Sequence, residues 1–252
     1  MRRLSLAFVA IASMLPFGAP AAECSARSSP NVTPLVELYT SEGCSSCPPA
    51  DRWLSRLALE AAAGRVVPLA FHVNYWDYIG WKDPFASASG TQRQRDIQAA
   101  AGARYVYTPQ VVLGGRDFRD WGSGSFQTAV AGIRSERAAA AIDLSVTGDG
   151  AKGVEVASTT TAIGAVSGEV VVLVALTQSG LSSRVTAGEN TGERLAHDFV
   201  VRDFVVHRGL GTAASKFKPA PGWNLAHMRV AAFVQDRRTG RVLQSVGCAL
   251  GG

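Results

Sequence analysis

The sequence predicts an α/β domain followed by a β-rich domain, and three observations support this prediction. Short apolar runs alternate with helical stretches up to about residue 140. Beyond that point, strand-like segments are separated by Gly, Thr and Ser, as in a β-sandwich. The motif Cys44-Ser45-Ser46-Cys47 lies between an apolar run and a helical pattern, a setting in which CxxC is typical of a thioredoxin-like redox protein. We therefore expect a thioredoxin-like domain over residues 22–140 and a β-sandwich-like domain over 141–252.

Residues 1–21 have the pattern of a secretory signal peptide. Arg2 and Arg3 form a charged start, residues 4–15 are mostly apolar, and residues 19–21 (Ala-Pro-Ala) fit a small-residue cleavage site. The apolar stretch is short for a membrane-spanning helix, and no later segment is long and apolar enough to be one. We expect a periplasmic or secreted protein that is not transmembrane once the signal is removed. An uncleaved anchor is the alternative.

A strand over residues 35–40 should lead into the CxxC motif. Apolar side chains then recur at helical spacing over residues 50–61, after a Pro-Pro pair that fits a first helical turn. Because a helix N-terminus favours a thiolate, we predict Cys44 as the attacking cysteine, exposed at the mouth of the helix. Cys47 would be the more buried resolving cysteine. A structural disulfide or half of a zinc site is the alternative.

A second buried strand is predicted over residues 66–71, which completes a parallel βαβ unit. Pro68 removes a backbone donor from this strand, so we expect it at an edge position. An aromatic insertion over residues 72–85 follows, at the sheet edge where the CxxC also emerges. We predict that Tyr75 and Trp76 bind substrate in a lid or groove beside the thiols. A small core that covers the helix or docks the second domain is the alternative.

The remainder of the first domain fits the order of a thioredoxin fold. A helix is expected over residues 91–101, with Thr91 and Gln94 as a capping box. A strand over residues 107–113 and a Gly-Gly turn then give a hairpin, followed by a last helix around residues 126–133. The predicted order is therefore βαβ, helix, ββα.

Thr108-Pro109 falls at the start of the third strand of this order. Thioredoxin-like proteins have a cis-proline there, which directs the preceding backbone towards the active site, where it can pair with a substrate peptide. We predict that Thr108 and Pro109 hold the substrate. An ordinary proline at the beginning of a strand is the alternative.

Two polar residues are candidates for proton transfer. Glu37 lies on the strand before the motif, one residue farther away than the buried acid of thioredoxins. His72 could stabilise the Cys44 thiolate or bind a metal. A structural role is the alternative for both. Glu42 would disfavour the thiolate if it lay close, because like charges repel.

The four cysteines form two natural pairs in an oxidising compartment. Cys44 would pair with Cys47, and Cys24 with Cys248 as a structural disulfide that ties the two chain ends together. Closing so long a loop is worth about 4–5 kcal/mol in chain-entropy terms. Other connectivities remain open at this point.

The second domain should consist of short strands with polar turns. The expected strands cover residues 142–147, 153–159, 169–177, 194–207, 226–236 and 242–246. His197, His207 and His227 lie on or beside these strands, but no pair shows the spacing of metal ligands. We therefore interpret them as polar strand positions and predict no metal site and no cofactor.

Charge excludes one class of partner. The formal net charge is +5, which falls to about +3 without Arg2 and Arg3, and the basic residues are scattered. No basic stripe indicates nucleic-acid binding, so we predict none.

Several segments resemble a family of secreted bacterial proteins known as domain of unknown function 1223. The similar segments are residues 36–51, 72–85, 107–110, 188–190 and 195–197. The resemblance covers nearly all of the chain after residue 21 and implies a thioredoxin-like domain followed by a β-rich domain. It implies no reaction. Asn74 stands where the family pattern leads us to expect an acid.

The function that these features favour is that of an exported thiol–disulfide oxidoreductase. Its partner would be a thiol- or disulfide-containing protein or small molecule, attacked by Cys44 and released by Cys47. One alternative is periplasmic handling of copper or zinc by Cys44, Cys47 and His72, since soft thiolates suit Cu(I) and Zn. Another is a non-catalytic binding protein in which the CxxC is a structural disulfide.

Overall fold

The structure is a computed structural model that describes residues 22–166, 168–218 and 220–251. The predicted signal peptide, residues 1–21, lies outside the described residues. Within the described part of the chain, no helix is long and apolar enough to cross a membrane.

The first half of the chain alternates strands and helices. Its strands are β1 (Ala22–Arg27), β2 (Leu35–Thr40), β3 (Val67–His72), β4 (Gln110–Leu113) and β5 (Arg116–Asp117). Its helices are α1 (Pro48–Ser55), α2 (Ala58–Ala62), the 3-10 helix η1 (Asn74–Ile79), α3 (Ala88–Ala100) and α4 (Ser125–Ser135).

The second half is almost entirely β-structure. Its strands are β6 (Ala140–Asp149), β7 (Gly153–Ala162), β8 (Val170–Gln178), β9 (Leu181–Arg184), β10 (Arg194–His197), β11 (Val200–Arg208), β12 (Gly211–Phe217), β13 (Met228–Asp236) and β14 (Val242–Ala249). A short 3-10 helix, η2 (Leu225–His227), precedes β13.

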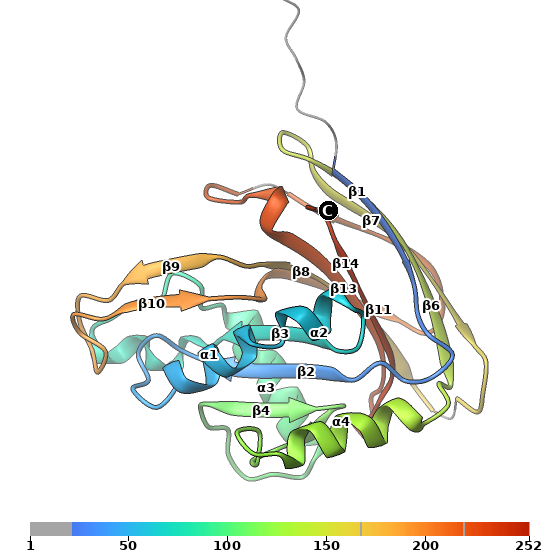
Figure 1. Ribbon diagram of the computed structural model, residues 1–252, viewed down its shortest axis with the longest axis horizontal. Helices are drawn as coiled ribbons and strands as arrows, with labels where there is room; N and C mark the ends of the chain where they lie inside the picture. The colour runs from blue at the N-terminus through green and yellow to red at the C-terminus, as the bar shows by residue number, and fades with distance from the viewer. Residues whose placement is uncertain (1–21, 167, 219, 252) are drawn as a thin grey trace, which may run out of the picture.

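The fold is mixed α/β, with a mixed central sheet and a separate antiparallel sheet (Figure 1). The central sheet has eight strands in the order β14-β13-β8-β11-β3-β2-β4-β5, and the antiparallel sheet has four in the order β1-β6-β7-β12. Strands β9 and β10 form a separate hairpin. Apolar residues from both large sheets, including Ile142, Val174 and Val230, fill a core between them.

In both large sheets, a strand that precedes residue 140 pairs with a strand that follows it. Strand β1 pairs with β6, and β11 joins β3 in parallel through Val200 and Ala70. The Cys24–Cys248 disulfide is present and links β1 to β14, so it fastens one sheet to the other. The two halves of the sequence are therefore interleaved in space.

The alternation of β2 and β3 separates two faces of the central sheet. Val36 and Leu38 pack with α1 and α4, whereas Leu35 and Tyr39 pack on the opposite face, where Ile97 of α3 also lies. Figure 1 shows α1 and α2 on one side of β2 and β3, with α3 on the other. The face on which a side chain of β2 or β3 lies therefore determines whether it packs towards α1 or towards α3.

Pro68 is accommodated in a strand that is not at the sheet edge. Strand β3 lies between β2 and β11, but β11 pairs with it only at Ala70. The amide of Val67 bonds towards β2 and that of Ala70 towards β11, at Phe199. The nitrogen of Pro68 therefore points towards β11. Because β11 pairs with β3 only at Ala70, no hydrogen bond between strands is lost at Pro68.

Several element boundaries differ from the sequence-based expectation. The helix expected over residues 50–61 is divided into α1 and α2 by a tight turn in which the Leu57 amide bonds Leu54. Helix α3 begins earlier than predicted, because Ser87 rather than Thr91 accepts the capping bond, from the amide of Gly90. The strand expected over residues 194–207 is interrupted at Phe199, whose φ of 58° is incompatible with a continuous strand.

Candidate functional site

The CxxC motif lies at the start of α1 as a disulfide. Cys44 and Cys47 are bonded to each other, and Cys47 is the N-cap residue of the helix. The amides of Ala50 and Asp51 donate to the Cys47 carbonyl oxygen at 2.9 and 3.1 Å. The Cys44 Sγ lies 3.4 Å from the Ser46 hydroxyl oxygen. Cys47 is therefore fixed by hydrogen bonds to the first turn of α1, and Cys44 lies against Ser46 within the motif.

Thr108 and Pro109 lie alongside this loop. The bond between them is cis, as expected from the sequence. Because Gln110 of β4 is opposite Tyr39 of β2, the two residues before β4 lie next to the end of β2, where the CxxC loop begins. Trp76 Nε1 donates to the Thr108 hydroxyl oxygen at 2.8 Å. The structure thus brings together three of the residues predicted for substrate binding.

Contrary to the sequence-based prediction, Cys44 is not exposed. Its exposed fraction is 1 %, and that of Cys47 is 0 %. Only Ser45 and Ser46, between the cysteines, reach the surface. The prediction considered only the N-terminus of α1. In the structure, two segments that are distant in the sequence cover the CxxC loop.

The aromatic insertion supplies the first part of the cover. Trp76 and Ile79 of η1 lie against Gly43, the residue before the motif. A Cβ at Gly43 would lie 3.0 Å from the Trp76 Cβ, so this close approach favours glycine. Trp81 Nε1 reaches past them and donates to Glu42 Oε2 at 2.9 Å. The insertion therefore packs over the start of the CxxC loop.

Residues 187–190, in the connection between β9 and β10, supply the second part and are called here the covering turn. Asn190 Nδ2 donates to the carbonyl oxygens of Glu42 and Cys44 at 2.8 and 3.1 Å. Glu189 Oε2 accepts from the Ser45 amide at 2.9 Å. Figure 1 shows the β9–β10 hairpin reaching out beside α1. These contacts hold the covering turn against the backbone of the loop that contains Cys44.

Replacing Asn190 with alanine should accelerate reduction of the Cys44–Cys47 disulfide by dithiothreitol. The change removes two hydrogen bonds worth about 1 kcal/mol each, so we expect a rate increase of about 30-fold. Quenched alkylation with intact-mass readout would measure it. Asn224, which caps η2, provides the matched control: Asn224→Ala should leave the rate unchanged. Equal rates for all three proteins would show that the covering turn does not limit access.

A buried histidine pair lies below the motif. His72 ends β3 on the side of α1, and His197 ends β10, which packs on α1. Their rings are 4.8 Å apart and nearly perpendicular. His72 Nδ1 lies 2.7 Å from Asp83 Oδ2, and His197 Nε2 lies 2.9 Å from Glu42 Oε1. Each imidazole therefore has one nitrogen fixed by a carboxylate.

Burial and these contacts shift the ionisation of the cluster. Burial opposes charge on His72, but the neighbouring Asp83 carboxylate outweighs it and raises the pKa of His72. Burial likewise opposes the ionised form of Asp83, yet His72 lowers the pKa of that carboxyl overall. Burial raises the pKa of Asp51, with His197 acting in the opposite direction.

Glu42, His197 and Asp51 are the residues of this site that sequence analysis missed. Glu42 was considered only as a charge near the thiol, whereas its carboxylate accepts from Trp81, Ser183 and His197. The segments that supply these donors are far apart in sequence, so no local spacing revealed the cluster. The available signal was the family-like segment 195–197, which contains His197.

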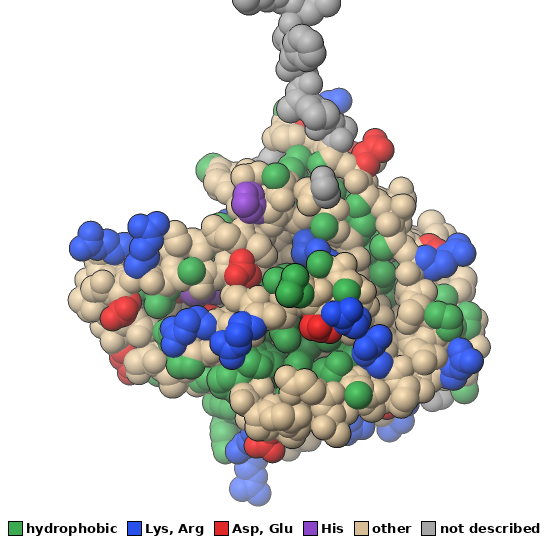
Figure 2. Space-filling model, in the orientation of Figure 1, with side chains coloured by type: hydrophobic (Ala, Val, Ile, Leu, Met, Phe, Trp, Pro, Cys, Tyr) green, Lys and Arg blue, Asp and Glu red, His purple; other side chains and the backbone are tan. Residues whose placement is uncertain are grey.

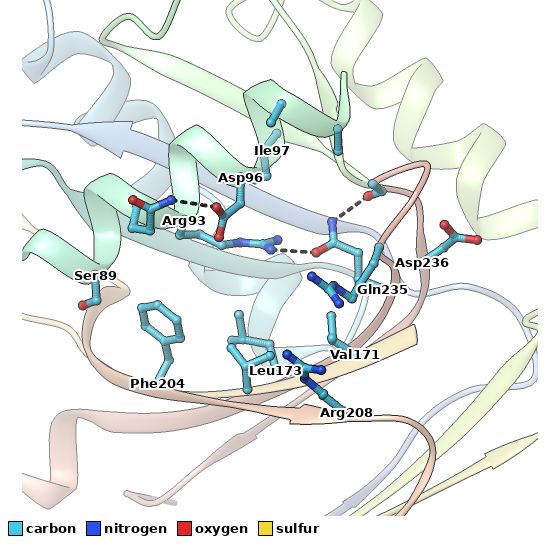
Figure 3. Close-up of a pocket in the computed structure, with 16 residues that line it drawn as sticks. Ser89, Arg93, Asp96, Ile97, Val171, Leu173, Phe204, Arg208, Gln235 and Asp236 are labelled. Atoms are coloured by element: carbon cyan, nitrogen blue, oxygen red, sulfur yellow. Dashed lines mark hydrogen bonds between the residues drawn. The ribbon is translucent and has the colours of Figure 1, made fainter. Parts of the chain in front are cut away.

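Glu37 lies away from the disulfide, on the other face of β2. Its carboxylate accepts two bonds from Arg93 of α3, at 3.0 and 3.1 Å, and one from the Tyr39 hydroxyl. Arg93 also borders a cavity of about 650 Å³ between α3 and strands β8, β11 and β13. Figure 3 shows Arg93 and Gln235 pointing towards each other across it. The structure does not bring Glu37 to the thiols.

The other predicted candidates are spread out. The Tyr75 hydroxyl donates to Gln94 of α3 at 3.2 Å, and its ring packs with the α3-side core. His207 bonds Ser215 at 2.8 Å, and His227 is exposed. Figure 2 shows Lys and Arg side chains scattered over one face with acidic side chains among them.

Comparison with known proteins places the chain in one family. The family described as "Protein of unknown function (DUF1223)" matches residues 35–235. Among solved structures, the crystal structure of protein AGR_C_4864 from Agrobacterium tumefaciens is similar, with 26% identity and a TM-score of 0.64. That match covers 89% of this chain and 97% of the other. The comparison with curated proteins found no match.

Proposed function

The chain belongs to the DUF1223 family, and from that premise we propose that it is an exported thiol–disulfide oxidoreductase acting through Cys44 and Cys47. The observation that carries the proposal is the Cys44–Cys47 disulfide at the first turn of α1. Pro48 and Pro49 carry no N–H, so it is the positive end of the α1 dipole that would favour a thiolate and make the reduced pair reactive at neutral pH.

Strand topology supports assigning residues 35–140 to a thioredoxin-like unit. Strands β2 and β3 are parallel and joined through α1, while β4 and β5 form an antiparallel hairpin beside β2. Thr108 and Pro109 precede β4 next to the motif, where an extended partner segment would meet the disulfide. The β-rich remainder supplies β9 and β10, whose covering turn restricts which partners reach the sulfur.

The proposed reaction begins from the disulfide form. A partner thiolate attacks Cys44 Sγ, forming a mixed disulfide and releasing Cys47 as a thiolate, which takes up a proton. A second thiolate of the partner then attacks its own sulfur in that bond. The partner leaves as a disulfide, and Cys44 and Cys47 are left as a dithiol, so two electrons have moved. The reverse sequence reduces a partner disulfide.

Two features support an exported location and a thiol partner. Both cysteine pairs are disulfides, which persist in oxidising compartments. The surface between the cysteines is formed by the small, exposed Ser45 and Ser46, which leave room for a partner once the covering turn moves. The partner is a protein or small molecule that carries a thiol or disulfide.

A redox titration in glutathione buffers tests the proposal, with quenched alkylation and intact-mass readout. We expect a two-electron transition between about −120 and −270 mV, as for exchange enzymes. Cys44→Ser should abolish it, while Ser46→Ala, a matched change in the same loop, should retain it. The Cys24–Cys248 disulfide should stay oxidised throughout.

A second candidate is a non-catalytic binding protein with a structural CxxC disulfide, favoured by the 1 % exposure of Cys44. Under this alternative the Cys44–Cys47 pair would remain oxidised below about −300 mV. That outcome, in the protein with Asn190→Ala as well as in the parent chain, would reject the exchange function, because access would no longer explain the resistance.

A further inference from the structure

Three buried side chains below the disulfide present metal-ligating atoms to one another. His72 comes from the end of β3, His197 from the end of β10 and Asp51 from the first turns of α1. One donor atom from each lies within 4.8 Å of the other two. The exposed fractions are 1 % for His72, 2 % for His197 and 7 % for Asp51. Sequence spacing gives no indication of this group, since the three residues come from separate segments.

Both imidazoles have a free nitrogen here. Among the described residues, His72 Nε2 and His197 Nδ1 are buried side-chain atoms without a hydrogen-bond partner. The Asp51 Oδ2 lies 3.9 Å from His197 Nδ1, too far for a hydrogen bond. A buried polar atom without a partner destabilises a protein, so two of them on neighbouring imidazoles indicate a missing occupant.

The other nitrogen of each imidazole is fixed in the way that metal sites require. Asp83 accepts from His72 Nδ1, and Glu42 accepts from His197 Nε2. In the neutral imidazole the proton lies on the nitrogen that faces the carboxylate and the free nitrogen carries a lone pair, so a metal ion would displace any proton held there. Carboxylates that orient ligating histidines in this way are common in metal sites, where they also strengthen the ligand.

The charge of the cluster calls for a cation. Glu42, Asp51 and Asp83 are all buried, and no lysine or arginine within the described ranges forms an ion pair with them. A buried carboxylate is costly unless a positive charge or several donors compensate it. Glu42 and Asp83 have such donors, whereas the groups that favour an ionised Asp51 are the two imidazoles and the Thr40 hydroxyl.

We propose that His72, His197 and Asp51 bind a divalent first-row transition-metal ion, with Zn²⁺ as the probe. Two imidazoles and a carboxylate suit zinc, which binds them at about 2.0–2.2 Å in tetrahedral geometry. Donors in such a site are about 3.3 Å apart, so the side chains close inwards by about an ångström or more. The ion joins β3, α1 and β10, and so fastens the covering hairpin to the helix that carries the thiols.

This site is separate from the thiols and from the exchange reaction proposed above. Its ligands are nitrogen and oxygen atoms, and it forms while Cys44 and Cys47 remain disulfide-bonded. Metal binding and thiol exchange can therefore be tested independently, and either can fail without the other.

The experiment uses purified, tag-free chain with both disulfides intact. After treatment with a chelator, the chain is titrated with Zn²⁺ against a chromophoric competitor, both in the native state and after refolding with the metal present. Refolding is included because the ligands are buried. We expect one ion per chain and a higher melting temperature, since an ion that binds only the folded state stabilises it. An absence of binding under both conditions overturns the proposal.

Variants identify the ligands. His197→Gln and Asp51→Asn should each remove the stoichiometric binding, and Glu42→Gln should weaken it by about 10–100-fold as an outer partner. His227→Gln is the matched control, because His227 is exposed and is not one of the three residues of the cluster, and it should bind like the parent chain. Circular dichroism confirms folding. Binding that survives in folded His197→Gln and Asp51→Asn contradicts the assignment.

Replacing both cysteines of the motif distinguishes this site from a thiolate site. The Cys44→Ser/Cys47→Ser chain should still bind one Zn²⁺, and its Co²⁺ complex should show visible tetrahedral bands without a sulfur-to-metal charge-transfer band. Loss of binding in this double variant, when it is folded, would assign the metal to the thiols instead and overturn the proposal.

Discussion

Replacing Cys24 and Cys248 together with serine should lower the free energy of unfolding by about 5 kcal/mol. The disulfide closes a loop with a sequence separation of 224, so its loss frees most of the unfolded chain. It also removes the covalent link between β1 in the four-stranded sheet and β14 in the eight-stranded sheet. Chemical denaturation followed by circular dichroism would measure the difference.

The motif disulfide provides the control for this prediction. Cys44 and Cys47 are only three residues apart, so replacing both with serine should cost about 2 kcal/mol by the same chain-entropy argument. Equal losses for the two double variants would show that loop length does not set the stabilisation.

Replacing Arg93 with methionine should destabilise the chain by about 3–5 kcal/mol. The change preserves much of the side-chain volume but leaves the Glu37 carboxylate buried without its counter-charge. It also removes the bond to Gln235 and the stacking of the guanidinium over Phe233 at 5.2 Å. Urea denaturation of the variant and the parent chain would measure the loss.

Two controls test whether the loss of stability comes from leaving a buried charge unpaired. Arg237 pairs with Glu169 at 2.8 Å on the surface, so Arg237→Met should cost no more than about 1 kcal/mol. The double variant Arg93→Met/Glu37→Met should recover most of the stability, because neither charge remains in the core. If Arg93→Met costs no more than Arg237→Met, the buried pair is not a source of stability.

The local structure of the thiol motif could be predicted from sequence because short-range rules determine it. The apolar run of β2, the proline pair and the apolar face of α1 are all read within 30 residues. The position of the cis bond before Pro109 and the hairpin after β4 follow from equally local signals. The Cys24–Cys248 pairing could be proposed as one of few possibilities.

The mutual placement of distant segments could not be predicted. Strand alternation turns Glu37 towards Arg93 and His72 towards α1, but the partner on each face is known only once the sheet is assembled. The covering turn is a loop of the β-rich half, and nothing local indicates that Asn190 bonds Cys44.

The sequence by itself determined the CxxC helix, the succession of strands and helices from residue 35 to about 133 and the β-rich character of the second half, since propensity and periodicity act over short distances. Only the tertiary structure decided that both cysteines are buried and that His72, His197 and Asp51 meet. Those contacts depend on β11 joining β3 and on β10 packing against α1. Such long-range packing is a cooperative result of burying apolar surface, and no single segment encodes it.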